Sequence, residues 1–196
     1  MIKKYLKKVL LLTTLVTTSL YSTDYTFESN SLVGIEAGFN RVSSEMTNTR
    51  NDYNSYKDNL GSLGLKIGGQ TRNYRIYLGA RYFVDTNNKF DYISTYGAEG
   101  QYIFNIFSGT DFFLGVEGGI VNIKFQVKGE NLSRTLSDPY FGGGVGISFD
   151  ISDTSYFELG TKLLNIDAVN NNNHTSYQFN NIISTYMSIV IKYQMD

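Results

Sequence analysis

The stretch Phe112–Ile120, which reads FFLGVEGGI, decides the fold of this chain. Alternate residues of the stretch are apolar or glycine, namely Phe112, Leu114, Val116, Gly118 and Ile120. The residues between them place the carboxylate of Glu117 among Phe113, Gly115 and Gly119. Successive side chains of a β-strand point to opposite sides. The stretch therefore predicts a strand with one face suited to hydrocarbon and the other to a narrow polar space.

The same alternation recurs along the chain and predicts eight strands. Their connections alternate between longer polar tracts, at 42–59, 85–91, 126–138 and 167–181, and short turns, at 69–73, 105–111 and 150–154. Pro139 falls where we expect the sixth strand to start. An antiparallel barrel with an even number of strands and long loops at one rim has this rhythm. We predict an all-β, eight-stranded, antiparallel transmembrane barrel over residues 32–196, after a polar lead-in over 23–31.

The N-terminus has the pattern of a secretory signal. Lys3, Lys4, Lys7 and Lys8 precede an apolar, Thr-rich run over 9–20, and Tyr21-Ser22-Thr23 follows. A basic region, a short apolar region and small residues are the marks of a cleavable signal peptide. We predict a signal peptide over 1–22, because the apolar run is shorter than the roughly 18 residues that a spanning helix needs.

The composition limits the classes of function. The chain has 196 residues, no Cys and one Pro, which fits one domain without disulfides. Removal of the signal takes away four of the 17 basic residues and leaves 13 against 18 acidic ones. An acidic mature chain argues against nucleic acid as the partner. The sequence contains no motif for a metal or another cofactor, and we expect neither.

Charge separates a membrane barrel from a secreted, water-soluble one, which alternation alone leaves open. The ionised residues of the strand cores all share the polar face: Glu36, Lys66, Arg75, Arg81, Glu99, Glu117, Glu158, Lys162 and Lys192. A cation facing lipid at mid-depth costs about 2–4 kcal/mol, so this separation favours the membrane. Because buried charges persist when paired, we predict that these nine form a charge network in the lumen.

Aromatic residues gather near both ends of the apolar face. We predict two girdles at the membrane interfaces. They comprise Phe39, Tyr82, Tyr92 and Phe141 near the long-loop rim, and Tyr74, Tyr102, Phe104, Phe112, Phe149, Phe157 and Tyr193 near the other. Glycine is frequent on the polar face, as the crowded inside of a narrow barrel requires.

This pattern resembles the OmpA/OmpX-type superfamily of eight-stranded outer-membrane barrels, over residues 31–196. Ile189, Ile191, Tyr193 and Met195 keep the alternation of the C-terminal assembly signal of that family, with Met195-Asp196 in place of a terminal Phe. The resemblance implies export to the outer membrane of a Gram-negative bacterium and contact with lipid and lipopolysaccharide. It also implies assembly by the β-barrel machinery and a monomer.

Three functions remain open from the sequence. A lumen filled by side chains predicts a structural or surface-interaction platform whose long loops meet an unknown extracellular ligand. The alternative is a narrow porin-like channel. The second alternative is an enzyme, because His174-Thr175-Ser176 is similar to part of the site of lipid A deacylases. That resemblance would make His174 the base, Ser176 the nucleophile and Glu158 the group that orients His174. We expect no enzymatic activity.

Overall fold

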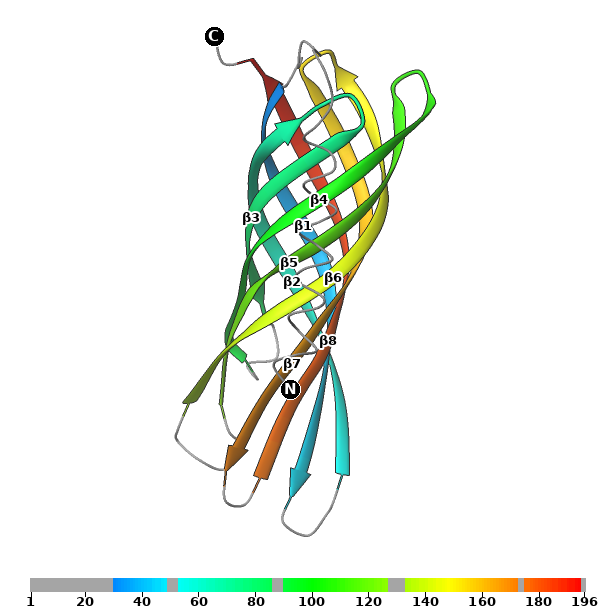
Figure 1. The fold of residues 1–196 in the computed structure, drawn as a ribbon. Helices are drawn as coiled ribbons and strands as arrows, with labels where there is room; N and C mark the ends of the chain where they lie inside the picture. Colours follow the sequence, from blue (N-terminus) through cyan, green and yellow to red (C-terminus); the bar gives the residue numbers. More distant parts are fainter. Residues whose placement is uncertain (1–29, 49–52, 86–89, 127–132, 173–174, 195–196) are drawn as a thin grey trace, which may run out of the picture.

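A computed structural model describes residues 30–48, 53–85, 90–126, 133–172 and 175–194. They form eight strands: β1 (Asn30–Asn48), β2 (Tyr53–Gln70), β3 (Tyr74–Val84), β4 (Phe90–Phe107), β5 (Thr110–Gln126), β6 (Ser133–Ser152), β7 (Ser155–Asn172) and β8 (Thr175–Tyr193). Each strand pairs antiparallel with the next, and β8 pairs with β1 to close the barrel (Figure 1). The predicted fold class is confirmed. The predicted signal peptide, 1–22, lies outside the described residues.

The strand that decided the prediction has the expected orientation. On β5, Leu114, Val116 and Ile120 are 44%, 71% and 52% exposed on the outer wall. Phe113 and Glu117 point inward and are 1% and 8% exposed. An apolar outer wall and a polar interior are what a lipid environment selects. Within the described ranges, the structure has no helix that is both long and apolar enough to span a membrane.

The strands are longer than the sequence analysis predicted, and the long polar loops are correspondingly shorter. The tract at 42–59 is mostly strand, because β1 continues to Asn48 and β2 begins at Tyr53. The tracts at 126–138 and 167–181 are likewise occupied by β6, β7 and β8, so Pro139 lies inside β6 and not at its start. Pro139 is tolerated there because the pairing of β6 with β7 begins only at Tyr140.

The extended hairpins contain an apolar core that the sequence analysis missed. The buried side chains of this extension core are Val42, Leu60, Phe83, Ile93, Val121, Ile123, Phe125, Tyr140, Leu164, Ile166, Ala168, Phe179 and Ile182. They come from all eight strands at the end of the barrel away from the short turns, where the hairpins β1–β2, β5–β6 and β7–β8 project in Figure 1. This part of the barrel is packed like the interior of a water-soluble β protein.

On β1 and β5 the apolar residues shift from the outward to the inward positions, and we infer that this change of phase marks where the membrane ends. On β5, the apolar side chain of Ile120 points outward, whereas Val121 and Ile123, which follow it, point inward and are fully buried. On β1, Phe39 points outward, and the next outward residue is the charged Arg41. Val42, which points inward, belongs to the extension core. Hydrocarbon outside favours apolar residues on the outer face, and water outside reverses that preference. The sequence therefore carried a signal for the extensions, in the parity of its apolar residues.

Candidate functional site

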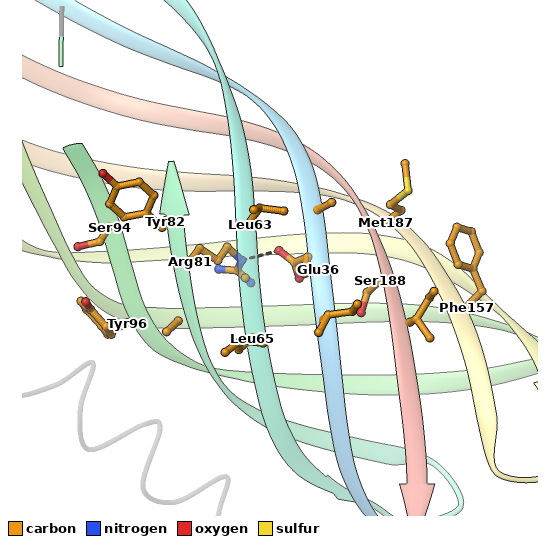
Figure 2. Close-up of a pocket in the computed structure, with 15 residues that line it drawn as sticks. Glu36, Leu63, Leu65, Arg81, Tyr82, Ser94, Tyr96, Phe157, Met187 and Ser188 are labelled. Carbon is orange, nitrogen blue, oxygen red and sulfur yellow. Dashed lines mark hydrogen bonds and ion pairs between the residues drawn. The ribbon is translucent and has the colours of Figure 1, made fainter. Parts of the chain in front are cut away.

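The lumen in the membrane-spanning part holds two layers of paired charges. In the layer nearer the extensions, which we term the upper layer, Arg81 of β3 is the central residue. Its Nε donates to Glu36 of β1 at 2.6 Å, and its two terminal nitrogens donate to Glu117 of β5 at 2.5 and 3.1 Å. Figure 2 shows Arg81 and Glu36 pointing toward one another. A guanidinium with this planar fork fixes two carboxylates at once.

Lys162 of β7 closes the upper layer from the opposite wall. Its Nζ donates to Glu99 of β4 at 2.6 Å and to Glu117 at 3.2 Å, and lies 3.8 Å from Glu36. Tyr140 of β6 adds a hydroxyl that donates to Glu117 at 2.6 Å. Three carboxylates thus share two cations, with all five charges buried at their side chains. The layer crosses the whole width of the lumen.

The lower layer, nearer the short turns, is built around Glu158 of β7. The side chain of Glu158 is fully buried and accepts hydrogen bonds from Lys66 of β2, from Arg75 of β3 at 3.3 Å and from the hydroxyl of Tyr77 at 3.2 Å. Arg75 also donates to Ser148 of β6 at 3.2 Å, and it lies 3.4 Å from Asp111 of β5. A buried carboxylate with two cations and a hydroxyl has its desolvation offset by these contacts.

Tyrosine rings fill the space between and below these layers. The ring of Tyr186 on β8 lies 4.4 Å from Nζ of Lys162 above and 5.7 Å from Nζ of Lys66 below. Tyr77 and Tyr156 share a 2.5 Å hydrogen bond across the lumen, and Arg75 stacks 4.4 Å from the Tyr156 ring. The contacts of the Tyr186 and Tyr156 rings with Lys162, Lys66 and Arg75 are cation–π interactions, which the sequence had not predicted. The sequence did carry a signal for these contacts, because the tyrosines occupy the same inward positions of their strands as the charged residues.

Glycines of the inner face make the room for these rings. A Cβ placed on Gly160 of β7 would lie 2.7 Å from three atoms of Tyr186. A Cβ on Gly97 of β4 would collide with the hydroxyl of Tyr140, and one on Gly146 of β6 with the ring of Phe113. Each of these three large side chains therefore lies over a glycine of another strand, one or two strands away. This complementarity fills the narrow lumen.

The structure places the nine residues of the predicted charge network on the inner face, but not in one cluster. Eight of them make up the two layers. Lys192 lies at the short-turn rim, where it is 3.4 Å from Asp150 and its side chain is 17% exposed. Asp111 takes part in the lower layer instead, although it had been predicted as part of a turn. The side chain of Arg75 is 2% exposed, whereas that of Asp111 is 19% exposed. This pair therefore marks the lower boundary of the filled region.

No protein-family model matches the sequence, and no curated protein sequence matches it. Solved structures do match. Neisserial surface protein A superposes with a TM-score of 0.63 at 12% identity, over 83% of this chain and 97% of that one. The N-terminal β-barrel domain of Pseudomonas aeruginosa OprF gives 0.52 at 11% identity, over 85% and 100%. Pseudomonas aeruginosa outer membrane protein OprG gives 0.51 at 10%, over 88% and 100%. The chain has the fold of the eight-stranded outer-membrane β-barrels.

As in an outer-membrane barrel, the predicted girdle residues lie on the outer wall. Eight of the eleven are at least 39% exposed, and Tyr92, Phe112 and Phe157 are partly exposed. Tyr74, Tyr102, Phe104 and Phe112 form a ladder of rings toward the short turns, with successive centroids 5.1, 4.7 and 5.9 Å apart. Tyr96, 54% exposed, extends the other girdle although it was not predicted there.

The barrel fold separates Ser176 from Glu158, the two described residues of the deacylase hypothesis. His174 lies outside the described residues, whereas Ser176 lies on β8 near the tip of an extension. Glu158, on β7, pairs in register with Ser188 of β8. Ser188 is about 40 Å along β8 from Ser176, so Glu158 is equally far from Ser176. Glu158 is also held by Lys66 and Arg75. A catalytic site that combines Glu158 with Ser176 is therefore wrong.

Proposed function

We propose that the protein is a monomeric structural platform in the outer membrane of a Gram-negative bacterium, with a sealed lumen and extended hairpins that present a surface to the outside. Export by the predicted signal peptide and insertion by the β-barrel assembly machinery belong to the same proposal. The observation that carries it is the filling of the lumen by two charged layers and an apolar core in series.

The two charged layers and the extension core block the lumen by different means. The upper layer connects Glu36, Arg81, Glu99, Glu117 and Lys162 by direct contacts, so an ion that entered would have to break them. The extension core follows next, with side chains such as Phe83, Ile93 and Val121 at most 2% exposed. An ion pays a large desolvation cost in such apolar surroundings. The channel alternative is the weaker one for this reason.

The extensions are rigid enough to serve as a platform. β1 pairs with β2 as far as Thr47 and Tyr53, and β7 pairs with β8 as far as Asn172 and Thr175. Strand pairing and the extension core hold these hairpins, where free loops would be mobile. Their exposed residues include the polar Arg41, Asn59 and Asn165 as well as Tyr56 and Val169. A surface of this kind suits contact with an extracellular ligand, and this contact stays a prediction.

Two measurements test this proposal. Cell fractionation with heated and unheated gel electrophoresis should find a protein of heat-modifiable mobility in the outer-membrane fraction. In planar lipid bilayers the purified mature protein should give no steady single-channel steps, while an established porin in the same bilayer gives them. Steady steps from this protein would replace the platform by the channel.

The absence of enzymatic activity also stays a prediction. Mass spectrometry of lipid A from cells with and without the protein should show the same acyl chains. Loss of an acyl chain only in the presence of the protein would establish an enzyme, and its site would have to exclude Glu158.

A further inference from the structure

The outer wall of the barrel has an apolar hollow that extends over β1, β2 and β3 and reaches β4 on one side and β7 and β8 on the other. Ala37 and Ala80 are small residues within it, and Leu63, Leu65 and Tyr82 stand around them. Figure 2 shows Leu63, Leu65 and Tyr82 on the neighbouring strands β2 and β3. These three large side chains are between 51% and 66% exposed. An apolar hollow on a lipid-facing wall offers a seat for an acyl chain.

An open path leads from this hollow toward the polar extensions. Leu63, Gly61, Asn59 and Lys57 occupy successive outward positions of β2. At Gly61 an added Cβ would meet nothing within 4 Å. Its partners on either side, Phe39 of β1 and Val84 of β3, are 61% and 47% exposed. Gly61 therefore leaves a gap in the outer surface between the side chains of Phe39 and Val84.

Two cations stand where the path reaches water. Arg41 pairs in register with Asn59, and Lys57 with Ser43, so the two charged side chains are diagonal neighbours on the outer face of β1 and β2. Nε of Arg41 donates to Oδ1 of Asn59 at 3.4 Å, which holds the guanidinium over β2. Among the described residues, neither cation makes an ion pair with a carboxylate. Glu45, which pairs in register with Ser55, is the other diagonal neighbour of Lys57 and lies on the side away from the hollow.

We propose that this wall binds one phosphorylated lipid of the outer leaflet, with its phosphate between Arg41 and Lys57 and an acyl chain laid across Gly61 into the hollow. The inference rests on the proposed placement in the outer membrane. Arg and Lys are the residues that bind phosphate, and each basic residue near an anionic membrane surface contributes about 1 kcal/mol. Along β2, the cations come first, then the open position at Gly61, then the apolar hollow. A phosphorylated lipid has the same order, with its head group first, then its glycerol or sugar, then its acyl chains.

The test uses the full mature chain in detergent micelles, with diphosphoryl lipid A as the probe and phosphatidylcholine as the neutral comparison. Native mass spectrometry counts the lipid molecules retained as each probe is titrated. The charge variant is Arg41→Gln with Lys57→Gln, and its control is Arg72→Gln, which removes a cation at the opposite rim. The path variant is Gly61→Val, and its control is Gly100→Val, another outward glycine with nothing within 4 Å of an added Cβ.

The wild-type protein should retain one lipid A in preference to phosphatidylcholine. The charge variant should lower the apparent affinity for lipid A by about tenfold or more. Gly61→Val should lower it severalfold, and both controls should leave it unchanged. Equal binding by wild type, charge variant and Gly61→Val would overturn the proposal. So would an equal loss in Gly100→Val, or a protein dimer in place of the lipid adduct.

Heat-modifiable mobility of every variant confirms that each one is folded before its binding is compared. Fractionation and conductance test the proposed function separately. A protein found outside the outer membrane would remove both proposals, whereas an outer-membrane protein whose lipid binding ignores Arg41, Lys57 and Gly61 would remove only the lipid site.

Discussion

The guanidinium of Arg81 donates to both carboxylate oxygens of Glu117, one bond from each terminal nitrogen, across the inside of the barrel. The same guanidinium donates through Nε to Glu36. Both carboxylates are buried, Glu117 at 8% and Glu36 at 5% exposure, so water cannot replace the cation if it is lost. Arg81 is thus the residue on which the upper layer depends most.

Arg81→Met should lower the free energy of unfolding by about 3–5 kcal/mol, because it leaves buried carboxylates without their main partner. Urea titration of the protein folded in lipid vesicles measures this change. Adding Glu117→Gln should recover part of the loss. Lys192→Met, at the rim, should cost no more than about 1 kcal/mol. Equal effects of the Arg81 and Lys192 substitutions would show that the upper layer does not stabilise the barrel.

Gly160→Ala should destabilise the barrel by about 1–3 kcal/mol, because the new Cβ would meet the ring of Tyr186. Gly100→Ala adds the same methyl group to an open outward position and serves as the control. The change in unfolded-state entropy is common to both substitutions, so their difference isolates the contact. Tyr186→Leu in the Gly160→Ala background should restore part of the stability. Identical urea midpoints for the two alanine variants would argue against this contact.

Val116→Arg should lower the free energy of unfolding in vesicles by about 2–4 kcal/mol, because Val116 faces lipid at the centre of β5. Asn165→Arg has the same outward direction on β7, but above the change of phase, and should shift stability by no more than about 0.5 kcal/mol. A similar cost at both positions would mean that the extensions also lie in the membrane.

The chain has no Trp, so single Trp substitutions can report depth without background. Val116→Trp should be quenched by lipids brominated in the middle of their acyl chains. Thr135→Trp, outward and exposed on β6 beyond the change of phase, should not be quenched. Phe141→Trp, in the girdle between them, should be quenched most by bromine near the head groups. Strong mid-chain quenching at residue 135 would contradict the boundary drawn from the strand parities.

The sequence by itself determined the fold, the number of strands and the orientation of their faces. Phe112–Ile120 sufficed to separate an apolar face from a polar one, because a strand has a period of two and lipid tolerates no charge at mid-depth. The inward direction of Glu117, Arg81 and Lys162 followed from the same rule. The strand limits predicted from the sequence are too short. Tracts such as 42–59 have polar outward residues and resemble loops, although the parity of their few apolar residues carried a signal for strands.

Only the tertiary structure decided which inward charges meet. Arg81, Glu117 and Lys162 lie on three different strands, and their contacts depend on the register and closure of the barrel. It also showed that Lys192 stays at the rim, while Tyr186 links the two layers. Strand parity is a local property that neighbouring residues fix, whereas contacts across a lumen join residues far apart in the chain. Those contacts arise only when β8 pairs with β1 and the sheet closes.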